Sequence, residues 1–230
     1  MITLYSYPGL FGVRDNNPYG LKVLAFLKLS GLDFRHEHVL DASAAPRRQL
    51  PYLVDDGETI GDSDRIIAHL IAKYRLAIDE GLSAAERKTN HLIRRMLDDL
   101  YWVMSYSRWR DERFWPLFRD AFLKAQPEVE ARALTAAREY NFARYEHQGI
   151  GRYAPNEVYE RGLADLRVLA ELVPESGFLF GDKPTSGDAG VYGFLANIYF
   201  YAIETPLKQF VVSRTNLVRH CTAIHDAVSR

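Results

Sequence analysis

The sequence predicts a small α/β domain followed by a larger all-helical domain. Over residues 1–74, runs with alternating polarity and runs with helical spacing follow one another as strand, helix, strand, connector, strand, strand and helix. A polar linker with a glycine, residues 75–82, comes next, and beyond it the apolar patterns have the helical period. We therefore place the domains at residues 1–78 and 83–230.

The composition bounds the class of protein. The chain has 230 residues, 47% hydrophobic and 26% charged, which allows a sizeable core in a soluble protein. Its net charge of −1 offers no basic excess to neutralise phosphates, so we expect no nucleic acid partner. Cys221 is the only cysteine, which excludes an internal disulfide framework. Met1 leads straight into a strand pattern, and no apolar run is long enough for a bilayer. We therefore expect no signal peptide, no membrane span and a cytoplasmic location.

The first elements follow from alternation and spacing. Residues 2–7 alternate as a strand, and residues 8–17 form a loop rich in glycine, asparagine and aspartate. A helix over residues 21–29 stops at a Ser-Gly pair, which suits a helix C-terminus. Residues 34–40 form the second strand, and a polar connector leads to the next unit.

The unit over residues 49–74 organises the chain. Pro51 leads into a strand at 52–54, a turn at 55–57 and a second strand at 58–60. The helix that opens next carries its apolar residues on one face, namely Ile66, Ile67, Leu70, Ile71 and Tyr74.

This unit has the features of a binding site. Pro51 cannot donate to a ladder, and a cis bond there would leave the backbone of Leu50 open to an extended peptide. Asp62 and Ser63 stand at a helix N-terminus, which favours a carboxylate. The alternative is that Pro51 is an edge proline and that Asp62 or Ser63 only caps the helix.

The same stretch resembles the glutathione-binding half of the thioredoxin-like domain in cytosolic glutathione transferases. The resemblance implies a cis bond at Pro51 and pairing of the Leu50 backbone with the cysteinyl part of glutathione. It implies that Asp62 and Ser63 hold the γ-glutamyl carboxylate and that Gln49 contacts the tripeptide. The implied fold is a thioredoxin-like α/β domain followed by an all-α helical bundle.

Residues 17–20, Asn-Pro-Tyr-Gly, stand where redox members of the thioredoxin superfamily carry Cys-Pro-Tyr-Cys. Both cysteines are absent, so dithiol exchange is excluded. In Ser- and Cys-type transferases the first of these positions holds the glutathione sulfur, and here it is Asn17. The alternative is a plain turn and helix start.

Asn17 can act on a thiolate, because its amide N–H₂ is a donor. A thiol with a pKa of about 8.5 is mostly protonated at neutral pH, and each unit of depression takes about 1.4 kcal/mol. A neutral hydrogen bond and a helix N-terminus each supply about 1 kcal/mol, enough for one to two units and a modest rate. Tyr5 and Tyr7, on one strand face, are rival donors as in Tyr-type transferases, or else ordinary strand aromatics.

The second half reads as helices. Ser83 and Glu86 form a capping box before a helix over residues 84–110, with Leu92, Met96, Leu100 and Val103 at core spacing. Further helices are predicted at residues 114–124, 127–147, 156–173 and 189–201, with an interruption at 148–152.

Two features of these helices carry further expectations. The aromatic end of the first long helix is either core or the wall of a cleft. By the transferase resemblance it faces the active site, which makes Tyr101, Tyr106, Arg108 and Trp109 candidate lining residues for a small hydrophobic electrophile. Thr185 and Asp188 form an N-capping motif like the folding-critical one in the transferase C-terminal domain, and we expect a structural role.

The resemblance narrows to the failed-axon-connections and metaxin-like branch and its bacterial relatives. It rests on three segments, residues 17–22 after the long first loop, 148–152, and 216–221. Asn17 departs from the usual Ser or Cys, and the lack of a membrane anchor disfavours a metaxin-like import role. The resemblance also implies a homodimer.

These observations lead to a glutathione transferase that conjugates glutathione, as co-substrate, to an electrophile. The alternative is a non-catalytic glutathione-binding or scaffold protein on the same fold. His36 and His38 share a strand face, but no further ligand completes a site, so we expect no metal.

Overall fold

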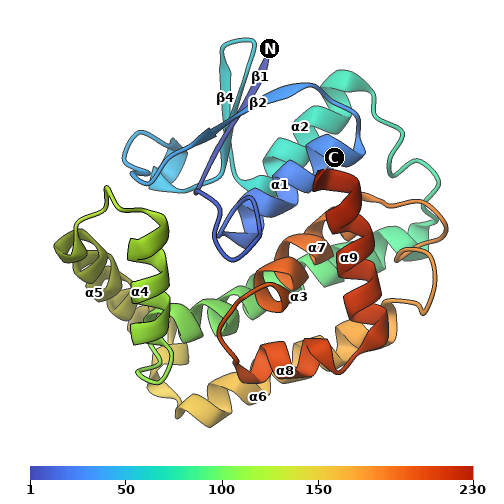
Figure 1. Cartoon of the computed structure of the whole chain (residues 1–230). Coiled ribbons are helices and arrows are strands. Elements are labelled where there is room, and N and C mark those ends of the chain that lie inside the picture. Colours follow the sequence, from blue (N-terminus) through green and yellow to red (C-terminus); the bar gives the residue numbers. More distant parts are fainter. Residues whose placement is uncertain (230) are drawn as a thin grey trace.

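The computed structural model describes residues 1–229 and places a mixed β-sheet with two helices beside a helical bundle (Figure 1). The strands are β1 (Ile2–Ser6), β2 (Phe34–His38), β3 (Tyr52–Asp55) and β4 (Glu58–Gly61), in the order β2-β1-β3-β4. β1 pairs with β2 in parallel and with β3 antiparallel, and β3 and β4 form the antiparallel hairpin.

Helices α1 (Pro18–Leu29) and α2 (Ser63–Tyr74) belong to this first part of the chain. Because side chains alternate along a strand, Leu4 of β1 and Leu53 of β3 turn into the core shared with the two helices, and both are fully buried. A short 3₁₀ turn, Pro46–Arg48, precedes β3.

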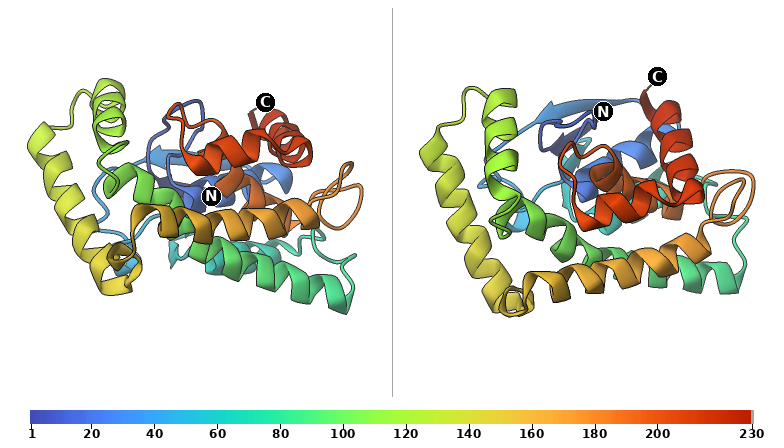
Figure 2. Two further views of the ribbon diagram at one scale, coloured as in Figure 1. Left: turned by 90° about the horizontal axis from the view of Figure 1, so that it is seen from below. Right: turned by 60° about the horizontal axis from the view of Figure 1, so that its bottom comes forward.

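The remaining helices follow α2 after a loop. They are α3 (Ala84–Trp109), α4 (Trp115–Ala125), α5 (Ala131–Gln148), α6 (Pro155–Leu172), α7 (Ser186–Tyr199), α8 (Pro206–Val212) and α9 (Thr215–Ser229). Helices α4 and α5 stand at one end of the molecule, away from α9 (Figure 2). The predicted fold class, an α/β part followed by an all-helical part, is confirmed. The limits at 1–78 and 83–230 stay a prediction.

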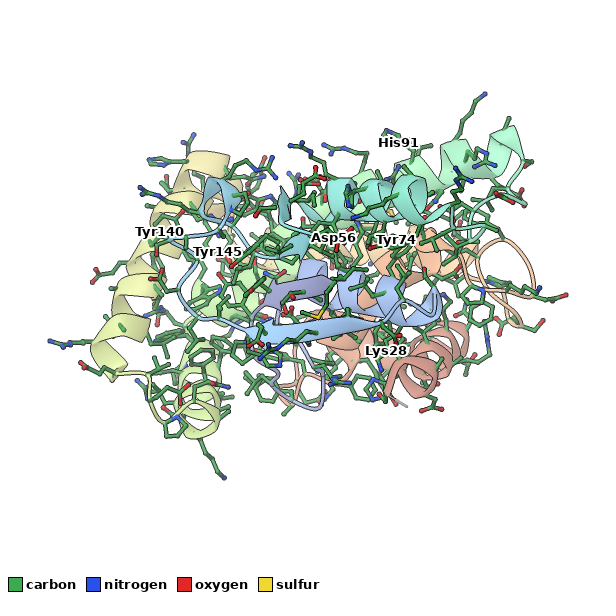
Figure 3. The ribbon with its side chains drawn as sticks, turned by 90° about the horizontal axis from the view of Figure 1, so that it is seen from above. Lys28, Asp56, Tyr74, His91, Tyr140 and Tyr145 are labelled. Carbon is green, nitrogen blue, oxygen red and sulfur yellow. The ribbon has the colours of Figure 1, made fainter. Side chains whose placement is uncertain are left out.

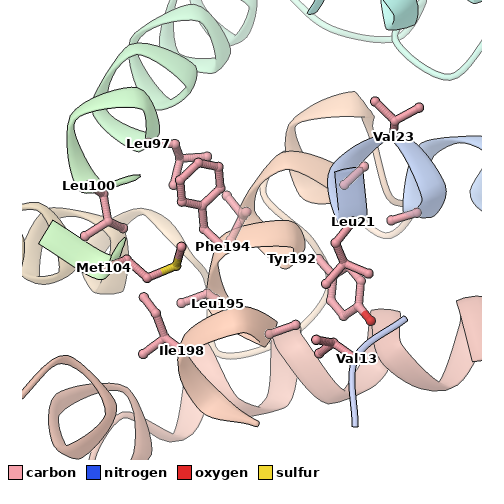
Figure 4. Close-up of a cluster of buried hydrophobic side chains, with 14 of the residues drawn as sticks. Val13, Leu21, Val23, Leu97, Leu100, Met104, Tyr192, Phe194, Leu195 and Ile198 are labelled. Atoms are coloured by element: carbon pink, nitrogen blue, oxygen red, sulfur yellow. The ribbon is translucent and has the colours of Figure 1, made fainter. Parts of the chain in front are cut away.

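Helix α7 forms the centre of the core. Its Tyr192 lies beside Val13 and Leu21, while Phe194 lies near Leu97 of α3 (Figure 4). The backbones of α1 and α7 approach so closely that a Cβ on Gly193 would lie 2.4 Å from the Pro18 carbonyl oxygen. Glycine at this position therefore lets the two parts of the chain meet.

Some predicted boundaries and faces were wrong. The second strand ends at His38 rather than at residue 40. Pro127 lies in a turn closed by Val129 N–H to the Gln126 carbonyl, so α5 begins only at Ala131. Leu92 is 66% exposed, because the core face of α3 runs one residue further on, through Ile93, Leu97 and Leu100.

Asp188 joins the start of α7 to α9. Its carboxylate accepts hydrogen bonds from the Leu179 N–H (2.9 Å), the Thr185 N–H and hydroxyl (both 2.8 Å), and it bonds to the His220 ring (2.8 Å). Burial alone would raise the pKa of Asp188, but the hydrogen bonds from His220, Leu179 and Thr185 lower it below its usual range. The structural role expected for Thr185 and Asp188 agrees with this network.

We predict that Asp188→Ala lowers the free energy of unfolding by about 3–5 kcal/mol, because buried donors lose their charged acceptor. Glu86→Ala, at the exposed capping box that opens α3, is the matched control and should cost about 1 kcal/mol. Urea unfolding of both variants measures the difference. Equal losses would mean that the Asp188 network adds nothing beyond an ordinary helix cap.

Candidate functional site

A polar cavity of about 400 Å³ and an apolar cavity of about 330 Å³ adjoin between the sheet and the α3–α5 end of the bundle. Figure 3 shows Tyr140 on α5, at that end of the molecule. The junction of the cavities is the set of residues that line both, namely Tyr7, Asn17, Tyr101, Tyr140 and Arg144.

The polar cavity receives the loop before β3. Gln49, Leu50 and Pro51 line it, and the peptide bond between Leu50 and Pro51 is cis. β3 begins immediately afterwards, so this loop lies at the N-terminal end of an internal strand of the sheet. Arg47 and Arg48 line the same side.

The N-terminus of α2 forms the next wall. Asp62 caps the helix, with Oδ1 accepting from the N–H of Asp64 (3.0 Å) and of Arg65 (3.1 Å). Its other oxygen accepts from Arg47 (3.2 Å). The capping interpretation of Asp62 therefore holds, and the residue still lines the cavity together with Ser63.

Lys22 lies behind the N-terminus of α2, and its role was not predicted from the sequence patterns. Its ammonium, only 5% exposed, donates to the Ser63 hydroxyl (3.3 Å) and pairs with Asp64. It is the one charged residue among the apolar residues of the first helix up to Leu27, which was the available signal.

Asp98 of α3 was also missed. The Tyr19 hydroxyl donates to it at 3.1 Å and Arg95 pairs with it at 2.9 Å, while burial raises the pKa of Asp98 above its usual range. Asp62, Asp64 and Asp98 thus bring carboxylates into a cavity that also holds arginines, a distribution suited to a ligand with charges of both signs.

Asn17 is the N-cap of α1. Its Oδ1 accepts from the Tyr19 N–H (3.0 Å), and its own N–H donates to Asp15 Oδ1 (2.7 Å). Because the cap uses the carboxamide oxygen, Nδ2 is the group of this side chain that can donate to a ligand at the junction.

The two candidate tyrosines are placed differently. Tyr7 lines both cavities, and burial, the largest cause, raises the pKa of Tyr7 to about 12, so its hydroxyl stays a proton donor. Tyr5 stacks on Tyr52 with ring centroids 4.5 Å apart and lines neither cavity. The structure thus brings Tyr7 to Asn17 and keeps Tyr5 on the sheet as a strand aromatic.

Of the α3 residues predicted to line the cleft, Tyr101, Arg108 and Trp109 line the apolar cavity. Tyr106 does not, which corrects that expectation. It is 4% exposed and packs edge-on against Tyr145 and Tyr159, because its position on the helix turns it away from the face of Tyr101.

Arg108 holds the junction in place rather than offering a free charge. One terminal nitrogen donates to the carbonyl and side chain of Asn16, and the other donates to the Asn197 carbonyl and Oδ1, both at 3.1 Å. Nδ2 of Asn197 donates in turn to the Asp15 carbonyl (3.3 Å). The loop before α1 is therefore bound to α3 and α7.

The match to known families follows this architecture. The model of the glutathione S-transferase N-terminal domain matches residues 18–114, and that of the C-terminal domain matches residues 162–224. The isoprene-epoxide–glutathione S-transferase of Rhodococcus sp. (strain AD45) is 31% identical over 234 residues, covering 97% of this chain and 98% of that protein. The chain belongs to the glutathione S-transferase family.

Other relatives of this transferase-family chain have different names. Failed axon connections of Drosophila melanogaster is 27% identical over 98% of the chain, which spans 57% of that protein's length. Metaxin-1 of Sus scrofa is 24% identical over 96% of the chain and 73% of that protein. The resemblance to this branch is confirmed. Within the described residues, no helix is both long and apolar enough to cross a bilayer.

Several solved structures share the fold. The β-etherase LigF of Sphingobium sp. strain SYK-6 is 16% identical, with a TM-score of 0.64 over 98% of each chain. A glutathione S-transferase of Methylobacterium radiotolerans, solved with glutathione sulfonate, is 17% identical, with a TM-score of 0.64 over 99% of this chain and 94% of that one.

Asp15 lies next to Asn17 of the junction in this transferase-family protein. Its carboxyl is completely buried, and within the described residues Oδ2 has no hydrogen-bond partner. The carboxyl fills the space beside Gly20, where a Cβ would lie 1.7 Å from Oδ2. Burial raises the pKa of Asp15 to about 8, against the lowering effect of hydrogen bonds from Ser6 and Asn17.

We predict that the contribution of Asp15 to the stability of the wild-type protein falls as pH rises from about 4 to about 8, because the folded state binds the Asp15 proton more tightly than the unfolded state does. Asp15→Asn keeps an acceptor for the Asn17 N–H and carries no charge, so it should remove this part of the pH dependence. Urea unfolding across that pH range measures it, with the exposed Asp182→Asn as control. Parallel stability curves for wild type and Asp15→Asn would contradict the assignment.

Proposed function

We propose that the protein binds reduced glutathione in the polar cavity and transfers its sulfur to a small electrophile in the apolar cavity. The single observation that carries this proposal is the junction, where Asn17 and Tyr7 stand between a charged cavity and an aromatic one. Membership of the transferase family supports glutathione as the ligand.

The polar cavity fits the charges of the tripeptide. Glutathione carries two carboxylates and one ammonium at neutral pH. The start of α2, with Lys22 behind it, offers the Ser63 N–H, the Ser63 hydroxyl and positive charge to the γ-glutamyl carboxylate. Asp64 and Asp98 suit the ammonium.

The remaining parts of the tripeptide meet the loop before β3. The backbone of Leu50, just before the cis bond and the start of β3, pairs with the extended cysteinyl part. Gln49 and Arg48 stand on the side left for the glycyl carboxylate. This arrangement directs the sulfur toward Asn17.

The chain's own groups then act on the sulfur. Asn17 Nδ2, the Tyr7 hydroxyl and the N-terminus of α1 favour the thiolate over the thiol, by about 1 kcal/mol for each neutral donor. The thiol proton leaves to solvent, and the thiolate attacks the carbon of an electrophile held beside it, so proximity supplies most of the rate. An epoxide is the first electrophile to test, because the relative from Rhodococcus is named for one.

A second candidate function is a non-catalytic binding or scaffold role. Asn17 favours it, because an amide stabilises a thiolate only modestly. The relatives named failed axon connections and metaxin-1 belong to the same comparison. A cytoplasmic location and homodimerisation stay predictions from the resemblance.

Calorimetric titration with reduced glutathione tests the ligand. We expect saturable binding that Ser63→Ala and Asp62→Ala each weaken by more than tenfold, about 1.4 kcal/mol. Ser63→Ala removes a hydroxyl donor to the γ-glutamyl carboxylate, and Asp62→Ala removes the cap that orders the start of α2. Ser83→Ala, which removes the helix cap at the start of α3, is the control and should leave the affinity unchanged. Absence of binding up to about 10 mM would reject glutathione as the ligand and leave the scaffold function.

The thiol donors are tested by titrating bound glutathione, following thiolate ultraviolet absorbance against pH. Asn17→Ala should raise the pKa of the bound thiol by about one unit, since one donor is lost. Asn17→Ser, which keeps a capping oxygen and adds a hydroxyl donor, should restore it. Tyr7→Phe measures the rival donor and Tyr5→Phe is its control. If Asn17→Ala leaves the titration unchanged while Tyr7→Phe shifts it, Tyr7 rather than Asn17 stabilises the thiolate.

A further inference from the structure

The apolar cavity has an unbalanced charge. Within residues 1–229, no aspartate or glutamate lines it, whereas Arg108 and Arg144 do. Both terminal nitrogens of Arg108 are used by Asn16 and Asn197. Its guanidinium therefore holds the loop before α1 in position. Arg144 is the other cation of the apolar cavity, and it is the one that can bind a ligand.

Arg144 stands at the junction itself. Among the described residues, it is the one cation that lines both cavities. Its guanidinium carbon lies 5.0 Å from the centre of the Trp102 ring and 5.9 Å from that of Tyr140. One terminal nitrogen of the planar guanidinium donates to Asn141 Oδ1 at 3.0 Å. A guanidinium has five N–H donors in a fixed fork, so further N–H groups can donate to a ligand. The two rings and Asn141 hold the fork in one orientation.

Tyr101 adds a second donor at the same place. Its side chain lines both cavities, as that of Arg144 does, and its phenol hydroxyl is a hydrogen-bond donor. Arg144 and Tyr101 are thus donors at the same junction as Asn17 and Tyr7.

We propose that Arg144, with Tyr101, binds the oxygen of the electrophile, so that the site favours electrophiles whose oxygen gains negative charge as sulfur adds, epoxides above all. This inference rests on the proposed function. It assigns Arg144 to the electrophile rather than to glutathione.

The step balances without a further reactant. The glutathione thiolate forms a bond to one epoxide carbon while the C–O bond breaks, and its electron pair stays on oxygen. The resulting alkoxide is stabilised by the Arg144 guanidinium, which keeps its own proton. The alkoxide then takes a proton from water, which replaces the one that the thiol released. Donors fixed before the reaction are most effective where charge develops, and here it develops on oxygen.

An alkyl iodide is the matched probe, because the same thiolate attack expels a diffuse iodide that is a poor hydrogen-bond acceptor. We compare kcat/KM for styrene oxide and for an alkyl iodide in wild type and Arg144→Met, which keeps the length of the side chain without its charge. Arg144→Met should lower epoxide turnover by about 100-fold and iodide turnover by no more than about threefold. Arg144→Lys, with charge but no fork, should lose about tenfold on the epoxide.

Two controls keep the result specific. Arg132→Met, on the same helix with its side chain 84% exposed, should change neither rate. Calorimetry should give Arg144→Met a glutathione affinity within about threefold of wild type, and thermal melting should confirm that it folds.

Equal losses on both electrophiles, or a glutathione affinity that falls as far as the epoxide rate, would overturn the inference and make Arg144 a glutathione-binding residue. A wild type that conjugates the iodide but not the epoxide would also overturn it while leaving the proposed function standing. A wild type that conjugates neither, or binds no glutathione, would reject the proposed function and this inference with it.

Discussion

The buried guanidinium of Arg108 is the interaction on which the site depends. It comes from α3 and binds Asn16, just before α1, and Asn197, on α7. The residue that follows, Asn17, is therefore placed by the helical part of the chain, although it belongs to the sheet-bearing part. The close approach at Gly193 brings α7 against the start of α1 and makes this placement possible. Because a buried cation without its acceptors is costly, the two parts of the chain are held in one relative position.

The polar and the apolar cavity adjoin at the junction that this interaction holds in place. On one side, charges of both signs gather around the N-terminus of α2. On the other, aromatic rings of α3, α4 and α5 enclose a cavity whose described lining has no carboxylate. Asn17 and Arg144 both line this boundary, as a neutral and a charged donor. A sulfur bound on the polar side and a carbon bound on the apolar side would meet there, which is why geometry rather than one strong acid or base carries the proposed reaction.

The site was predictable where its chemistry is local in sequence. Pro51, Asp62 and Ser63 lie within one short unit, so their spacing revealed the helix start, and the family resemblance of the same unit implied the cis bond. Lys22 and Asp98 escaped notice because their partners, Ser63 and Tyr19, lie far along the chain. Tyr106 was assigned to the cleft because an aromatic run does not say which of its members face inward. Its packing partners, Tyr145 and Tyr159, come from α5 and α6, which only the folded chain brings together.

The sequence by itself determined the elements and their order, since alternation, helical spacing, capping boxes and the Asp-Asp-Gly turn act over a few residues. It also determined the thioredoxin-like pattern and the position of Asn17 at the N-terminus of the first helix. Only the tertiary structure decided which of Tyr5 and Tyr7 reaches the cleft, which face of α3 lines it, and that Arg144 of α5 arrives at the junction. These outcomes depend on how helices far apart in the chain pack, because burial depends on the neighbours of a side chain and not on its own identity.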